Sequence, residues 1–173
     1  MRIFYFLILL FGYAFGANYS VDVTNSKVEF RVKHMLISTV SGSFEKFSGS
    51  FSLNETSKQF SSFVGSVDIA TVSTKSQKRD NFIKSVDFFN MEKYPTMKLK
   101  FLEQNKDKVI MALTIKNITK NIEMQIKDIK EGSFTLHAEI NRKDFQLKFN
   151  KIGNATVGNT VKIRLKIEGV LTN

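Results

Sequence analysis

Two histidines and one Arg-Asp pair are the residues of this sequence best suited to acid–base or headgroup chemistry. His34 follows the run Val28-Phe30-Val32 at the next alternate position, so its side chain is expected on the same apolar side, near the end of a strand. This place suits either a core histidine hydrogen-bonded to backbone or to Asp80, or a polar residue that orients a ligand headgroup at a pocket mouth. His137 lies on the polar face of its own run, where a solvated histidine is expected.

Arg79 and Asp80 lie near the start of residues 77–95, which interrupt an otherwise alternating chain. The two side chains could form an ion pair or begin a helix, where an acid is favoured by the dipole. Beside a barrel mouth, the guanidinium could instead donate two hydrogen bonds to a diphosphate, carboxylate, amide or quinone oxygen. Phe82, Val86 and Phe89 share one helical face, and Tyr94-Pro95 disfavours helix continuation, so the stretch predicts a short capping helix.

Sequence motifs for catalysis are missing. The chain has no cysteine, no G-x-S-x-G and no glycine-rich phosphate loop. Neither histidine has a second His or Cys at metal-ligand spacing, so no metal site is predicted. A Ser, His and Asp arrangement assembled from distant segments stays open, but the chain is predicted not to be an enzyme.

The elements that must position these residues are strands, because apolar and polar residues alternate over most of the chain. Alternation is strongest in Met97–Phe101, Val109–Ile115, Ile122–Ile126, Phe134–Ile140 and Val161–Ile167, and weaker in Val28–Val32, Phe44–Leu53 and Phe63–Ile69. Turn signals separate these runs, including one at Gly153 to Asn159. About eight antiparallel strands are therefore predicted.

Such strands must bury a common apolar face, either as a sandwich or as a closed barrel. Phenylalanine is abundant, with 17 in the chain, and it fills space without requiring a polar partner, which favours the barrel. A barrel of about eight strands is just wide enough to fill with side chains or to hold one ligand. The polar partners are mostly Lys, Arg and Glu, which suit an outer surface in water better than an outer-membrane barrel.

The N-terminus predicts export. Met1 to Gly16 combine Arg2, an apolar core and the small-x-small site Ala14-Phe15-Gly16, as in a secretory signal, so residues 17–173 are predicted to form one domain in the periplasm. The apolar core is shorter than the about 20 residues that span a bilayer, so no permanent membrane anchor is expected. The chain has a formal charge of +10, for which a solvated basic face or attraction to anionic lipid surfaces is expected, rather than nucleic-acid binding.

Several short motifs recur in an order that carries more information than any one of them. They are Phe30-Arg31-Val32-Lys33-His34, Gly42-Ser43-Phe44, Arg79-Asp80, Asp87-Phe88-Phe89, Tyr94-Pro95, Leu113-Thr114-Ile115-Lys116, Thr119-Lys120 and Arg142-Lys143-Asp144-Phe145. Together they resemble the YceI-like family of lipocalin-like bacterial proteins that bind polyisoprenoid lipids. The chain departs from the family at Asn117 and Gln146, where a glycine is common.

The resemblance implies an all-β, antiparallel, lipocalin-like barrel with a short helix capping one end and a lipid in its lumen. The expected ligand is a long amphiphilic lipid such as an isoprenoid quinone, a polyprenyl phosphate or a fatty amide. The residues expected to bind it are His34, Arg79 and Asp80 at the polar end, with Phe30, Phe44, Phe88, Phe89, Phe101, Leu113 and Leu136 along the lumen. Arg142 and Asp144 are assigned to structure. A homodimer is also implied, and the rival is a ligand-free envelope protein whose barrel is filled by its own side chains.

Overall fold

The structure is a computed structural model that describes residues 16–35, 37–149 and 151–172, with the side chains of residues 151–153 left out. Most of the predicted signal segment therefore lies outside the described residues. The strands are β1 (Ala17–Val21), β2 (Lys27–His34), β3 (Ser38–Phe44), β4 (Phe47–Asn54), β5 (Gln59–Asp68), β6 (Val72–Ser73), β7 (Thr96–Asn105), β8 (Lys108–Ile115), β9 (Ile118–Lys130), β10 (Ser133–Asn141) and β11 (Val157–Leu171). The helical elements are η1 (Ile69–Thr71), α1 (Gln77–Lys84), η2 (Arg142–Phe145) and α2 (Lys151–Thr156).

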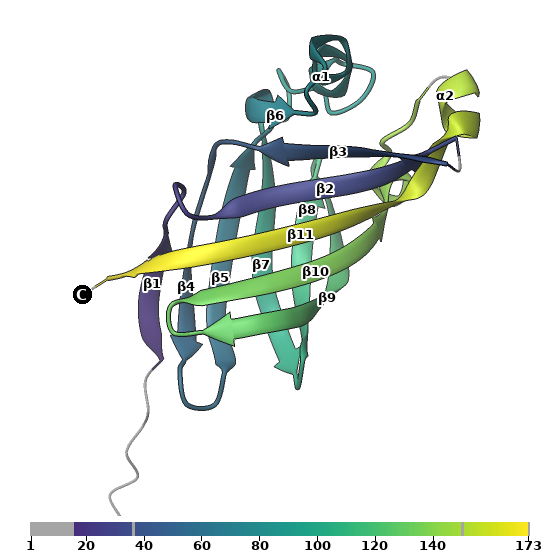
Figure 1. Cartoon of the computed structure of the whole chain (residues 1–173). Helices are drawn as coiled ribbons and strands as arrows, with labels where there is room; N and C mark the ends of the chain where they lie inside the picture. The colour runs from purple at the N-terminus through teal and green to yellow at the C-terminus, as the bar shows by residue number, and fades with distance from the viewer. Residues whose placement is uncertain (1–15, 36, 150, 173) are drawn as a thin grey trace, which may run out of the picture.

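Eight of these strands close an antiparallel barrel in the order β1, β4, β5, β7, β8, β9, β10 and β11 (Figure 1). The ring closes where Tyr19 of β1 lies opposite Leu171 of β11. Because β11 is 15 residues long, its first part also pairs with β2, and the sheet continues through β3 to β6. This architecture confirms the predicted barrel.

Alternation places one face of each strand in the core. In β8, Val109, Met111, Leu113 and Ile115 are buried, and the residues between them are partly exposed. The outer faces carry cross-strand ion pairs, such as Lys162 Nζ to Glu139 Oε1 at 3.0 Å. Exposed pairs of this kind contribute little to stability, so burial of the inner face holds the barrel together.

One end of the barrel is filled by aromatic rings. The ring of Phe134 meets Phe51 and Phe60 edge-on at centroid distances of 4.9 Å, and it meets Phe63 at 5.7 Å. Tyr19 stacks on Phe51 at 5.0 Å. Edge-to-face and stacked pairs at these separations add about 0.5–1.5 kcal/mol each beyond simple burial. The chain's own side chains therefore fill this half of the lumen.

A buried tyrosine anchors the same end. Tyr19 Oη donates to Glu55 Oε1 at 2.7 Å, and the Gly132 amide donates to the same oxygen at 3.1 Å. The hydrogen bond to Glu55 raises the pKa of Tyr19 to about 12, because ionising the phenol would lose this donor and place two negative charges together.

We expect Tyr19→Phe to lower the free energy of unfolding by about 1–2 kcal/mol at pH 7, because it leaves a Glu55 oxygen short of a donor. The folded pKa lies above the unfolded value of 10.0, so the tyrosine's contribution is complete below pH 10 and is lost as pH rises towards 12. Urea unfolding of both proteins at pH 7, 10 and 11.5 should therefore show that the difference in their free energies of unfolding shrinks as the pH rises. Tyr94→Phe serves as the control, and a Tyr19→Phe gap that is constant with pH would contradict this account.

Three local predictions were wrong. Helix α1 ends at Lys84, where Ser85 Oγ donates back to the Phe82 carbonyl at 2.8 Å, so Val86 lies beyond the helix and is 70% exposed instead of sharing its apolar face. The expected turn at residues 153–159 is instead the end of α2 followed directly by β11. The predicted strand Phe44–Leu53 is instead the last residue of β3, a turn at residues 45–46 and most of β4. Strand β1 was not predicted, because its five residues are too few to show a pattern.

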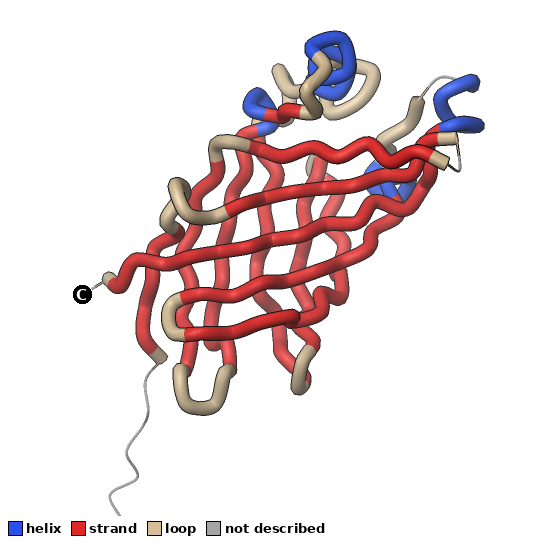
Figure 2. The backbone as a smooth tube through the Cα atoms, viewed as in Figure 1, coloured by secondary structure: helices blue, strands red, loops and turns tan. Residues whose placement is uncertain are grey.

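Helices gather towards one end of the barrel (Figure 2). That end is opposite the ring-filled end, since α1 follows the upper ends of β5 and β6 and α2 precedes β11 (Figure 1). The two connections that contain them, residues 69–95 and 142–156, frame the cavity described next.

Candidate lipid-binding cavity

The half of the barrel below these helices contains a cavity of about 360 Å³. Volumes of about 300–1,000 Å³ are typical of small-molecule sites. Alternate residues of β2 line it, namely Val28, Phe30, Val32 and His34, because the side chains of a strand point to one face at every second position. The wall continues with the inward residues of β11, which are Val161, Ile163, Leu165 and Ile167.

Seven of the ten residues predicted to bind the ligand line this cavity. They are His34, Arg79, Phe30, Phe44, Phe88, Phe89 and Leu113. Phe101 and Leu136 do not line it: Leu136 is fully buried in the packed core, and Phe101 lies 6.3 Å from Phe60 at the ring-filled end. Both point inwards as predicted, but at the wrong height along the barrel axis.

Asp80 is also absent from the cavity lining, and its carboxylate is hydrogen-bonded to Thr74. Asp80 Oδ1 accepts hydrogen bonds from the Thr74 amide at 2.9 Å and from the Thr74 hydroxyl. Arg79 Nε donates to the same Thr74 hydroxyl at 2.8 Å, and Arg79 Nη2 donates to the Thr74 carbonyl at 2.8 Å. No direct Arg79–Asp80 ion pair occurs among the described residues, so a buried threonine links the two charges.

This network sets the position of the Arg79 side chain. Thr74 is 4% exposed, and its hydroxyl and carbonyl hold one edge of the guanidinium. The remaining N–H groups of the fork have no acceptor among the described residues, and Arg79 lies on the cavity lining. An acceptor at the mouth could therefore bind to a guanidinium that is already oriented.

His34 lies at the last position of β2, at the mouth of the cavity. Its Nδ1 is 3.5 Å from Ser38 Oγ, which also donates to the His34 carbonyl at 2.8 Å. No hydrogen bond to Asp80, one of the expected partners, is formed in the described structure, and the imidazole instead lies near a hydroxyl of the neighbouring strand.

Arg142 was assigned to structure by the sequence, but it also lines the cavity. The residue is 2% exposed, and its Nη1 donates to the Leu147 carbonyl at 2.8 Å and to Asn154 Oδ1 at 3.1 Å. Its Nε and Nη2 donate to the carbonyls of Gly158 and Val157 at 3.1 and 3.2 Å. Burial lowers the pKa of Arg142, yet a guanidinium stays charged in proteins. All four acceptors are neutral, so this buried cation has no hydrogen-bonded carboxylate among the described residues.

An aromatic cluster joins the two connections at the mouth. Phe82 stacks on Phe149 at 5.5 Å, and Phe88 lies 4.9 Å from Phe149 and 5.2 Å from Phe89. The Arg142 guanidinium covers the same Phe149 ring at 4.8 Å. The residues after α1 are thereby packed against the segment between η2 and α2, and together they roof part of the cavity.

Within the described residues, no group of three or more His, Cys, Asp or Glu side chains is arranged to hold a metal ion. The described part of the chain also has no helix that is both long and apolar enough to cross a membrane. The chemistry that the cavity offers is burial of an apolar chain, with His34, Arg79 and Arg142 among its polar lining residues.

One known protein family has a sequence model that matches this barrel. The sequence model described as "YceI-like domain" matches residues 19–169, which is nearly all of the barrel. The chain belongs to the YceI-like family. Among curated relatives, this YceI-like chain is 30% identical over 157 residues to the UPF0312 protein plu2095 of Photorhabdus laumondii, covering 82% of each chain. It is 28% identical over 166 residues to the UPF0312 protein SA2479 of Staphylococcus aureus, covering 87% of this chain and 96% of the relative.

Solved structures share the YceI-like fold. BcnA of Burkholderia cenocepacia superposes with a TM-score of 0.71 at 20% identity, covering 85% of this chain and 98% of BcnA. The YceI protein of Campylobacter jejuni gives a TM-score of 0.67 at 26% identity, covering 82% and 90%. A polyisoprenoid-binding domain from Saccharophagus degradans gives 0.70 at 14% identity, covering 89% and 98%.

The two departures from the usual YceI-like sequence keep the backbone that glycine would favour. Asn117 has φ 61° and, with Lys116 at φ 51°, forms the two-residue turn between β8 and β9. Gln146 has φ 55° at the end of η2, where its amide donates to the Lys143 carbonyl at 3.0 Å. Asparagine tolerates this left-handed region, whereas glutamine adopts it less readily. The turns are therefore retained without glycine.

Proposed function

We propose that this YceI-like protein binds a long amphiphilic lipid, with the tail in the cavity and the polar head at the mouth. The observation that carries the proposal is a cavity closed at one end by aromatic rings, walled by aliphatic residues and supplied with polar side chains near its open end. The function is binding and not catalysis. The polyisoprenoid-binding domain of Saccharophagus degradans, which shares the fold, is consistent with such a ligand.

The energetics favour a lipid tail over a small polar ligand. Burying about ten methylene groups at about 0.8 kcal/mol each supplies about 8 kcal/mol before entropic costs, which corresponds to roughly micromolar binding at best. Hydrogen bonds from Arg79 would add affinity for a head that contains phosphate, amide or quinone oxygens. Isoprenoid quinones, polyprenyl phosphates and fatty amides all meet these requirements.

We further propose that the protein acts as a carrier or a store for this lipid after export to the periplasm. The support is the signal-like segment Met1 to Gly16, which would be removed during export. A homodimer stays a prediction from the family resemblance.

The direct test is native mass spectrometry of protein purified without detergent. The expected result is an added mass of several hundred daltons that disappears on denaturation and is recovered in an organic extract. Protein with no added mass that also takes up neither a prenyl quinone nor a fatty amide would overturn the proposal. That result would favour the ligand-free structural role.

A further inference from the structure

The cavity mouth carries apolar side chains that face solvent. Met35 and Ile37, in the turn between β2 and β3, are 59% and 92% exposed, and Val86, just after α1, is 70% exposed. Each is close in sequence to the cavity lining, since His34 precedes Met35 and Phe88 lies two residues after Val86. Two separate connections at one end of the barrel therefore both expose apolar side chains, which an apolar partner could cover.

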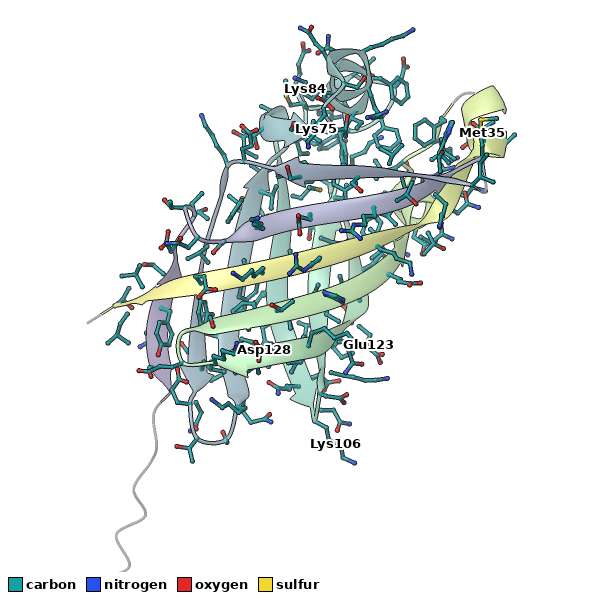
Figure 3. All side chains as sticks on the ribbon, in the orientation of Figure 1. Met35, Lys75, Lys84, Lys106, Glu123 and Asp128 are labelled. Carbon is teal, nitrogen blue, oxygen red and sulfur yellow. The ribbon has the colours of Figure 1, made fainter. Side chains whose placement is uncertain are left out.

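Basic residues gather around the same mouth. The described residues of the connections at this end, in the ranges 45–46, 69–95, 116–117, 142–149 and 154–156, contain ten basic and five acidic residues. The turns at the ring-filled end, 55–58, 106–107 and 131–132, contain two basic and three acidic residues. Lys75, Lys84 and Met35 lie at the same end of the molecule, with Lys106 at the other (Figure 3). The net positive charge is therefore polarised towards the mouth.

The lysines at the mouth are not neutralised locally. All six ion pairs among the described residues join side chains of the barrel wall or of the ring-filled end, for example Lys108 with Glu123 and Lys58 with Glu55. None includes Lys75, Lys84 or another lysine of the mouth connections. Asp80, one of the five acids there, already accepts hydrogen bonds from Thr74. The positive charge at this end is thus available to an external partner.

We infer that the mouth end docks on the surface of an anionic lipid bilayer. Met35, Ile37 and Val86 would enter the boundary between headgroups and acyl chains, and the surrounding lysines would lie among the phosphates. An anionic bilayer matches both the exposed apolar side chains and the lysines, because its acyl chains are apolar and its headgroups are negatively charged. An acidic protein would match the lysines alone. The less basic opposite end would orient the molecule with its mouth towards the membrane. This inference goes beyond lipid binding in the cavity and does not depend on it, since docking is measurable with the cavity empty or loaded.

Vesicle flotation tests the inference directly. Protein is mixed with vesicles of phosphatidylcholine alone or of phosphatidylcholine with one-third phosphatidylglycerol, at 50 mM and 500 mM salt. We expect binding to the anionic vesicles at low salt, with strong loss at high salt because the lysine–phosphate attraction is screened. Equal binding to both vesicle types, or no binding to either, would overturn the inference.

Matched variants separate the mouth from general stickiness and charge. The double variant Met35→Gln and Ile37→Gln should weaken binding to anionic vesicles by at least fivefold, whereas Val170→Gln with Leu171→Gln, which alters residues 55% and 60% exposed on β11, should not. Lys75→Gln should weaken it about fivefold, the factor equivalent to about 1 kcal/mol for one charge near the surface. Lys106→Gln is its control, because Lys106 has φ 54° and Lys75 has φ 60°, so both substitutions meet the same backbone.

Two outcomes would contradict docking by the mouth. Equal losses for the Lys75 and Lys106 variants would assign the binding to net charge. Insensitivity to the Met35 and Ile37 substitutions, together with tight binding to polyglutamate, would assign the lysines to a soluble acidic partner. Native mass spectrometry of the same variants separates this result from the proposed function, because a protein that retains lipid but ignores vesicles would refute docking alone.

Discussion

Replacing Ile163 with tryptophan is expected to abolish lipid uptake while leaving the barrel folded. Ile163 lies on β11 opposite Phe30, and both side chains line the cavity. An indole ring there would occupy space that the tail needs, and the cavity can take the added volume with less strain than a packed core. We expect at least a tenfold loss of affinity for a prenyl quinone in a fluorescence displacement assay, and no added mass in native mass spectrometry.

The control for this variant is Val64→Trp. Val64 is 49% exposed on the outer face of β5, opposite Lys100, so the same ring added there leaves the cavity unchanged. Uptake by the Val64 variant should match that of the parent protein. Full uptake by Ile163→Trp, with an unchanged melting temperature, would show that the tail does not use this cavity.

Arg142→Met is expected to lower the free energy of unfolding by about 3–5 kcal/mol. The substitution removes four charge-assisted hydrogen bonds, which are worth about 1.5–3 kcal/mol each before relaxation, and it leaves the Leu147, Val157 and Gly158 carbonyls without this donor. Methionine fills much of the volume of the arginine side chain, so the loss of stability reflects the missing hydrogen bonds more than a cavity. Urea unfolding should show the same loss at pH 5 and pH 8, because the guanidinium is charged at both.

Two further variants sharpen this result. Lys143→Met removes a charge from the exposed neighbouring residue and should change stability by less than about 0.5 kcal/mol. Arg142→Lys keeps the positive charge but loses the planar fork, so its loss should be intermediate. A stability loss for Arg142→Met no larger than that for Lys143→Met would mean that the network around residues 147–158 does not hold the mouth.

These variants test two different properties of the cavity. The Ile163 variant tests whether the tail space is used, and the Arg142 variant tests whether the connection that frames the mouth depends on a buried cation. Because Arg142 also lines the cavity and covers Phe149, its loss should weaken lipid binding as well. Lipid uptake by this variant should be measured well below its melting temperature, so that weaker binding does not reflect unfolded protein.

The identity of the strands with clear alternation, and the parity of their side chains, were predictable from the sequence. The alternation of Val161, Ile163, Leu165 and Ile167 with charged residues predicted β11 and its buried face, because period-two spacing follows directly from strand geometry. The same parity placed His34 on the inner side of β2, where the structure puts it on the cavity lining. The ordered motifs predicted the family, and the family model matches residues 19–169.

Only the tertiary structure decided the position of each side chain along the barrel axis, its hydrogen-bond partners and its burial. Phe101 and Leu136 have the correct parity but lie outside the cavity lining, because height along the barrel depends on the tilt and stagger of the closed sheet, which no single strand specifies. Thr74 links Arg79 to Asp80 only because the chain folds back between β6 and α1. Arg142 continues the inward-facing even positions of β10, but its burial as a cation depends on tertiary structure, since the carbonyls that accept from its guanidinium come from residues 147–158. Sequence therefore fixes which way a strand residue faces, and the closure of the barrel determines what it meets.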